Sequence, residues 1–171
     1  MNGPSPVALT KDNYSLRDKA FQIALFHLRE RDLLQRLARE VTQLTSNGLS
    51  VGDALLQRYQ LAEDLGHAFS ERAVLECFIV AESKQAPGPL QEILALLRSL
   101  YVLVLADEEP VFLRYGYLSS RQSQAIQEEI VHLCSEIRPH ALALVDSFGF
   151  PTSYLGPIAF DWIEANSWKN V

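Results

Sequence analysis

The sequence predicts an all-α fold, namely a helical bundle of two long antiparallel helices with several shorter ones. Two observations support this class. Apolar residues recur at steps of three and four along two long stretches, residues 15–46 and 50–86, as they do on one face of a helix. No stretch alternates apolar and polar residues with the period of two that a half-buried strand shows. The sequence therefore favours long amphipathic helices and predicts no sheet.

The first long helix has a start signal, an apolar face and a stop signal. Ser15 and Asp18 resemble a capping arrangement, in which short polar side chains accept hydrogen bonds from the free N–H groups of the first turn. Asn47 and Gly48 supply the stop. The apolar face consists of Phe21, Leu25, Leu28, Leu33 or Leu34, Leu37, Val41 and Leu44.

A second long helix is predicted from about Ser50 to the residues before Pro87, Gly88 and Pro89. Its apolar face consists of Val51, Leu55, Tyr59, Ala62, Leu65 or Gly66, Phe69, Ala73 and Phe78. A short glycine-containing turn joins it to the first helix. We expect the two helices to lie antiparallel, because only then do their apolar stripes face each other.

A third helix, from about Leu90 to Ala106, is apolar on nearly every side. This composition is typical of a helix in the middle of a larger core; the alternative is a face buried against another subunit or domain. The longest uninterrupted apolar run, Leu100 to Ala106, is much shorter than the roughly 18 residues of a membrane span. We therefore expect a soluble protein without a membrane partner.

Shorter helical segments complete the predicted fold. A short piece covers residues 110–116, and Ser119 or Ser120 caps the helix that follows. Pro139 interrupts that helix, because proline lacks the N–H group and disfavours helical geometry at the residue before it. A new helix runs from Pro139 to Gly149. A last short helix holds Phe160, Trp162 and Ile163.

Length and composition favour one compact domain. The chain has 171 residues, of which 48% are hydrophobic, enough for one sizeable core and too few for two ordinary domains. We expect an irregular lead-in over residues 1–14 and a single helical domain over residues 15–171. The net charge is −6 and charges of both signs are interspersed, which argues against a nucleic-acid partner.

The search for catalytic chemistry finds no recognisable motif. The glycine-rich phosphate loops, the GxSxG nucleophile motif and the paired-carboxylate helix motif are all missing from the sequence. Cys77 and Cys134 are isolated and predict reduced intracellular thiols. The four histidines, which lack metal-ligand spacing, are His27, His67, His132 and His140. We therefore assign no catalytic, cofactor-binding or metal-binding residue.

Several polar and aromatic clusters leave two interpretations open. The acidic clusters Glu63-Asp64, Asp107-Glu108-Glu109 and Glu128-Glu129 are interpreted as solvated faces or helix ends, and His140 as a helix-terminal residue rather than a binding residue. The tyrosines and tryptophans either fill the core or line a ligand pocket; they are Tyr14, Tyr59, Tyr101, Tyr115, Tyr117, Tyr154, Trp162 and Trp168. Four arginines of the first helix alternate with acidic residues, which predicts local ion pairs on an exposed face or, alternatively, pairs across a domain interface. These arginines are Arg29, Arg31, Arg36 and Arg39.

Three segments resemble the carboxy-terminal region of acyl-CoA oxidases. Residues 133–151, LCSEIRPHALALVDSFGFP, resemble a signature near the end of that family. Residues 21–34 resemble the start of the family's last domain, and residues 61–69 resemble its long second helix. The tail, residues 153–166, departs from the Tyr-Asp-Gly ending of long-chain oxidases and looks closer to plant enzymes acting on medium-chain substrates.

The resemblance implies an acyl-CoA dehydrogenase-like carboxy-terminal helical domain of a peroxisomal enzyme. The complete family enzyme uses FAD to convert fatty acyl-CoA and O2 into trans-2-enoyl-CoA and hydrogen peroxide. Its catalytic glutamate and main FAD contacts lie upstream of the matched region, so no residue here inherits them. A packing role and contacts in a homodimer are implied instead. The last residues, 168–171, do not resemble a Ser-Lys-Leu peroxisomal address.

The alternative is a free-standing helical module that associates with oxidase subunits. Under both interpretations this chain alone is expected to hold no FAD, and its partner is oxidase polypeptide, either upstream in the same chain or in another subunit.

Overall fold

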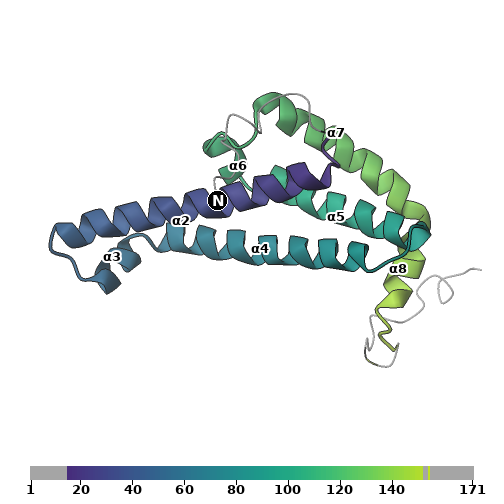
Figure 1. The fold of residues 1–171 in the computed structure, drawn as a ribbon, viewed down its shortest axis with the longest axis horizontal. Helices are drawn as coiled ribbons and strands as arrows, with labels where there is room; N and C mark the ends of the chain where they lie inside the picture. The colour runs from purple at the N-terminus through teal and green to yellow at the C-terminus, as the bar shows by residue number, and fades with distance from the viewer. Residues whose placement is uncertain (1–14, 152–153, 155–171) are drawn as a thin grey trace, which may run out of the picture. The chain divides into compact units, whose positions relative to one another are not determined.

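The computed structural model describes residues 15–151 and residue 154, and these fall into two compact units on either side of residue 137. The helices of the first unit are α2 (Lys19–Ser46), α3 (Val51–Gln57), α4 (Tyr59–Ser83), α5 (Pro89–Glu108), α6 (Val111–Arg114) and α7 (Ser120–Ile137), as Figure 1 shows. The second unit contains a short 3-10 turn, η1 (Arg138–His140), and α8 (Ala141–Ser147). The predicted all-α class is confirmed.

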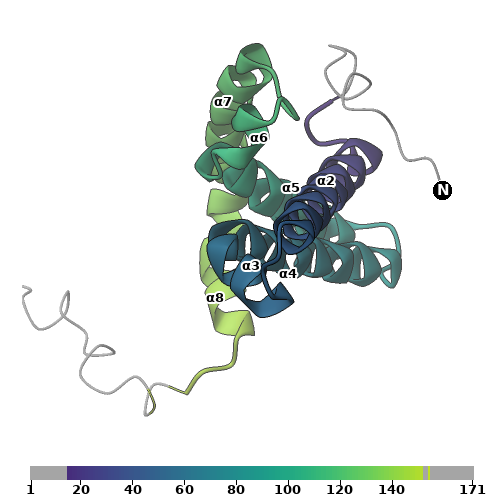
Figure 2. The same ribbon diagram turned by 90° about the vertical axis from the view of Figure 1, so that its left-hand side faces the viewer.

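Helices α2 and α4 form the antiparallel pair that the sequence predicts (Figures 1 and 2). Their ion pairs show the direction directly. Along α2, Lys19, Glu30 and Glu40 pair with residue 82, residue 72 and residue 58 in turn, so the partner numbers fall as the α2 numbers rise. Helix α5 contacts α4 on one side and α7 on the other. The frame is therefore a helical hairpin with two further helices packed along part of it.

The predicted caps hold both ends of α2. Asp18 accepts a hydrogen bond from the backbone N–H of Phe21 at 2.7 Å, as an N-cap residue does. At the other end Gly48 has φ of +95°, a left-handed conformation that closes a helix at little cost only for glycine. Ser50 then caps α3, accepting from the N–H of Asp53 at 3.1 Å. The start and stop signals in the sequence are confirmed.

The second predicted helix is divided, which the sequence analysis did not foresee. Arg58, with φ of −119° and ψ of 25°, separates α3 from α4. The break allows α3 to pack against α2 with Ala54 fully buried, while the Arg58 side chain pairs with Glu40 of α2 at 2.6 Å. Apolar periodicity missed the break because the same three- and four-residue steps continue on both sides of one residue.

The core of the first unit draws on α2, α4, α5, α6 and α7. Its buried members are Phe21, Leu25, Phe26, Leu28, Leu75, Val102, Leu103, Ala106, Val111, Phe112, Tyr117, Leu118, Ile126 and Leu133. Those from α2 all lie in its amino-terminal half. The far end of the α2–α4 hairpin, with α3, carries exposed Leu34, Leu56 and Tyr59 instead. The packing is thus concentrated at one end of the hairpin.

Helix α5 is long and apolar enough, by length and composition, to cross a membrane. The uninterrupted apolar run within it is much shorter, but the helix as a whole is apolar despite Glu92 and Arg98. In the first unit, α5 contributes Val102 and Leu103 to the core, and Arg98 pairs with a carboxylate of α4. These contacts are typical of a core helix.

The second unit begins where the sequence predicts an interruption. Helix α7 ends at Ile137, and Arg138 and Pro139 lie in η1 before α8 starts. Gly149, at φ of +64°, follows α8. No residue between 138 and 151 is buried. The predicted lead-in, residues 1–14, and the predicted helix around Phe160 lie outside the described residues.

Candidate functional site

A buried charged cluster joins α2, α4 and α5. Arg98 and Glu82 are each 4% exposed, and the Arg98 guanidinium donates hydrogen bonds to the carboxylate of Glu82 and to the side-chain oxygen of Gln22. Lys19 approaches the other oxygen of Glu82 at 2.7 Å, and Gln22 donates to the backbone carbonyl of Leu16 at 2.8 Å. Burial makes the charges of Arg98 and Glu82 depend on each other, since an unpaired charge in this position is costly, whereas Lys19 is 43% exposed.

A second buried arginine lies on α2 and is also paired with α4. Arg29 is 1% exposed; its guanidinium pairs with Glu71 of α4, lies 3.6 Å from Glu109 after α5, and stacks 4.9 Å from the ring centroid of Phe112. The prediction that Arg29 belongs to an exposed face with local pairs was wrong. Arg29 follows Leu25 by four residues, so it shares the buried face. That spacing was the signal the sequence offered.

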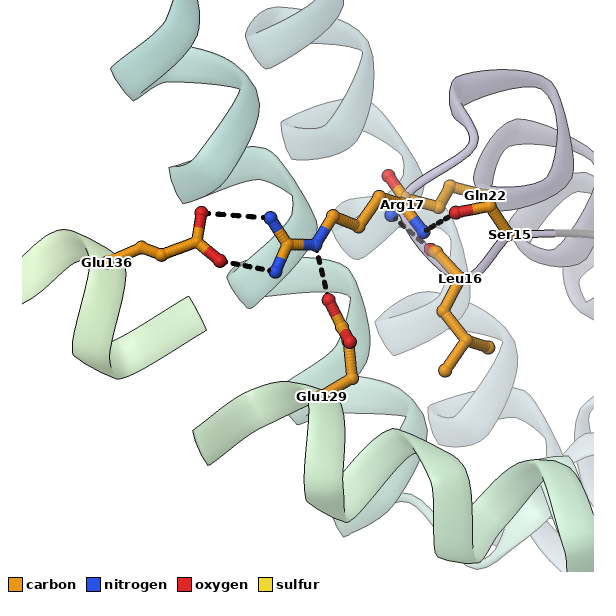
Figure 3. A network of polar contacts seen from close by, with 6 residues as sticks. All are labelled: Ser15, Leu16, Arg17, Gln22, Glu129 and Glu136. Atoms are coloured by element: carbon orange, nitrogen blue, oxygen red, sulfur yellow. Dashed lines mark hydrogen bonds and ion pairs between the residues drawn. The ribbon is translucent and has the colours of Figure 1, made fainter. Parts of the chain in front are cut away.

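Arg17, which precedes α2, forms ion pairs with two glutamates of α7 (Figure 3). Its two terminal nitrogens donate to the two oxygens of Glu136 at 3.0 and 2.6 Å, and its Nε donates to Glu129. This bidentate geometry is the one that a guanidinium offers a carboxylate. The hydrogen bonds from Arg17 lower the pKa of Glu136. Solvent reaches the pair, so it positions the chain more than it stabilises it.

A tyrosine that follows α6 donates a hydrogen bond to an aspartate of α2. The hydroxyl of Tyr117 donates to Asp32 of α2, which also accepts from Arg36 at 2.7 Å. Burial alone would raise the pKa of Asp32, but these two donors outweigh it and lower that pKa. Burial and the neighbouring carboxylate raise the pKa of Tyr117. The Arg36 pair is the local i, i+4 pair that the sequence predicts.

Two of the grooves on the first unit are shallow, with volumes of about 400 Å³ each. Residues lining the first are His27, Glu30, Arg31, Leu34 and Arg72. Residues lining the second are Arg17, Glu92, Ala95, Leu96, Arg98, Ser99 and Glu136. Arg72 is paired with Glu30 and Glu76, and Arg17 and Arg98 are paired with their own carboxylates. Glu92 and Glu136 would repel a pyrophosphate. The residues lining these grooves do not fit a dinucleotide cofactor such as FAD.

Some residues of the acidic clusters lie on the exposed surface, whereas others pair with arginines. Glu63 and Asp107 accept hydrogen bonds on the exposed surface, from Gln60 and Gln127. Glu109 and Glu129, in contrast, are partners of Arg29 and Arg17, a role the sequence analysis did not assign. His140 is exposed at the N-cap position of α8, as predicted for a helix-terminal residue.

The aromatic residues do not line a common pocket among the described residues. Tyr117 is buried in the core, and half-buried Tyr101 donates to the backbone carbonyl of Glu71 at 3.2 Å. Tyr115 lies beneath Arg36, while Tyr59 and Tyr154 are exposed. Tyr14, Trp162 and Trp168 lie outside the described residues. The described tyrosines thus include both core members and solvent-exposed side chains.

The described residues contain no group of three or more His, Cys, Asp and Glu side chains that could hold a metal ion. Cys77 and Cys134 are exposed thiols.

Comparison with known proteins identifies relatives in one family. The family model described as acyl-CoA oxidase matches residues 18–157. Over its whole length the chain is 49% identical to peroxisomal acyl-coenzyme A oxidase 3 of Arabidopsis thaliana, but it spans only 26% of that relative. It is 48% identical, over 99% of its length, to another Arabidopsis thaliana protein assigned by its name to the acyl-coenzyme A oxidases, and spans 91% of that one.

Solved structures share the fold. Acyl-CoA oxidase 3 from Yarrowia lipolytica superposes with a TM-score of 0.76 at 23% identity, covering 82% of this chain and 20% of that structure. An acyl-CoA oxidase from tomato gives a TM-score of 0.71 at 23% identity, covering 90% of this chain and 24% of that structure. The helical arrangement is therefore the one found in a limited part of these larger proteins.

Proposed function

Since the chain belongs to the acyl-CoA oxidase family, we propose that it acts as the carboxy-terminal helical domain of a peroxisomal acyl-CoA oxidase. In this role it packs against the part of the enzyme that holds FAD and contributes contacts between subunits. The observation that carries the proposal is its whole-length alignment with about a quarter of a peroxisomal oxidase at 49% identity. The reaction, acyl-CoA and O2 to trans-2-enoyl-CoA and hydrogen peroxide, belongs to the complete enzyme.

The chain's own residues support a packing role rather than independent turnover. A catalytic base for this reaction must reach the α-proton of a thioester beside a bound flavin. Glu82, Glu71 and Glu129 are engaged by arginines. Three arginines that line the two grooves, Arg17, Arg72 and Arg98, are paired with carboxylates. We propose that the base and the flavin site lie in the remaining polypeptide of the oxidase.

The test is the visible absorbance of the purified chain after incubation with FAD, followed by a hydrogen-peroxide assay with a medium-chain acyl-CoA. The proposal predicts a folded helical protein that is colourless and inactive. Bound flavin together with peroxide formation would show that this chain carries its own active site.

A second candidate is a free-standing helical module that associates with oxidase subunits. It is favoured by the relative of which this chain spans 91%, because that protein has little beyond this domain. The two candidates differ in one binding experiment. An intact oxidase already contains its own carboxy-terminal domain, so the first candidate predicts no stable capture of an intact Arabidopsis thaliana acyl-CoA oxidase 3 by the purified chain. The second predicts capture.

A further inference from the structure

Residues 138–151, which lie within the segment that resembles the family signature, have apolar side chains but no buried residue. Leu142, Val145, Phe148 and Phe150 are all exposed, from 64% for Val145 to 82% for Leu142. The rings of Phe148 and Phe150 stack on each other, 6.1 Å between centroids, and each residue remains 69% exposed. The described residues of the second unit, 138–151 and 154, therefore present an apolar surface that none of them buries.

The geometry of α8 gathers this surface on one side. Leu142, Val145 and Phe148 follow one another at steps of three, which places them along one side of a helix. A helix of seven residues is too short to be stable by its own hydrogen bonds, so it requires packing. A contiguous apolar side on such a helix is typical of a segment that is buried by a partner.

We propose that residues 141–150 are a docking element whose apolar side is covered by the FAD-holding part of an acyl-CoA oxidase polypeptide. This inference rests on the proposed function and names the surface that performs it. The family match continues through residue 157, so it includes this segment although nothing between residues 138 and 151 is buried. The relative that aligns with the whole chain has about three quarters of its length outside the alignment. That polypeptide is the covering partner that the exposed apolar side requires.

The experiment uses a chimera in which this chain replaces the aligned 172 residues of Arabidopsis thaliana acyl-CoA oxidase 3. Val145→Ser removes apolar surface from α8. Val131→Ser is the matched control, because Val131 on α7 is exposed to almost the same extent, 65% against 64%. Each variant is made in the chimera and in the isolated chain, and thermal unfolding, retained flavin and oligomeric state are measured.

The inference predicts that Val145→Ser lowers the Tm of the flavin-loaded chimera by roughly 2–4 °C, the scale of about 1 kcal/mol in a large domain. Val131→Ser leaves that Tm unchanged, and neither variant changes the Tm of the isolated chain. The double variant Leu142→Ser with Phe148→Ser enlarges the loss and releases flavin.

Several results would overturn the inference. Equal effects of the two valine variants in the chimera would show that α8 has no special partner there. A lower Tm of isolated Val145→Ser would show that α8 already packs on other residues of this chain, and loss of a dimer of the isolated chain would identify a second copy as the partner. An unaltered chimera that folds without flavin would contradict the proposed function itself, and the inference with it. If the unaltered chimera retains flavin and Val145→Ser leaves its Tm unchanged, the inference is contradicted and the proposed function is not.

Discussion

Leu133 and Leu142 lie nine residues apart on successive helices, yet the first is 0% exposed and the second 82%. Leu133 of α7 belongs to a core that α2, α4 and α5 complete. Leu142 lies on α8, a helix in which no residue is buried. Apolar spacing predicts equally well which side of each helix is apolar. It does not predict whether the polypeptide that covers that side lies in the same chain.

The largest expected effect concerns the buried Arg98–Glu82 pair of the packed unit. Glu82→Leu should lower the free energy of unfolding by about 3–5 kcal/mol, because it leaves Arg98 buried without its carboxylate. The double variant Glu82→Leu with Arg98→Met should recover much of this loss, since neither charge then remains buried. Urea denaturation of both proteins measures the difference.

The control for this prediction is Glu128→Leu, which changes an exposed glutamate on α7. It should alter the free energy of unfolding by no more than about 0.5 kcal/mol. A double variant as unstable as Glu82→Leu would mean that packing, rather than an unpaired charge, determines the loss.

The next prediction concerns the two leucines directly. Leu133→Ala should cost about 2–5 kcal/mol, because it opens a cavity in a core that cannot fully collapse. Leu142→Ala should cost close to nothing in the isolated chain, since the side chain is exposed there. Leu97→Ala should lie between them, because Leu97 is only partly buried. Similar costs for Leu133 and Leu142 in chemical denaturation would remove the contrast between the two units.

A smaller effect is expected at the start of α2. Asp18→Ala should cost about 1 kcal/mol, because it removes the side-chain acceptor of the Phe21 N–H. Asp18→Asn keeps an acceptor at the same position and should retain most of the stability. An alanine variant as stable as the asparagine variant, by urea denaturation, would show that the cap contributes little.

The smallest effect concerns the Arg17 pair. Because Arg17 lowers the pKa of Glu136 in the folded state, the stability from this pair is present above the pKa of Glu136 in the unfolded chain. It is lost as the pH falls through the lowered folded value. Arg17→Gln should therefore lower the Tm slightly at neutral pH and low salt. The difference from wild type should vanish in acid and shrink at high salt. A difference independent of pH would contradict this origin.

Local signals in the sequence predicted the ends of the helices well. Asp18, Ser50 and Gly48 act at the predicted places, because caps depend on neighbouring backbone groups alone. The interruption at Pro139 follows equally from the missing N–H. Such features require no knowledge of the tertiary fold.

The buried arginines and the break at Arg58, which the sequence did not predict, depend on distant partners. Arg29 and Arg98 are buried because Glu71 and Glu82 of α4 meet them there, and charge alone predicts exposure for an arginine. The break at Arg58 likewise serves the packing of α3 on α2. No spacing rule within one helix contains these contacts.

Hydrogen exchange of α8, compared between the isolated chain and the oxidase chimera, shows whether the rest of the oxidase covers this helix. In the isolated chain, amides of α5 and α7 should exchange slowly while those of α8 exchange rapidly. In the oxidase chimera, α8 should become protected to an extent approaching α7. Rapid exchange of α8 in both proteins, or slow exchange in both, would contradict the account of a packed domain whose last helix is completed by the rest of an acyl-CoA oxidase.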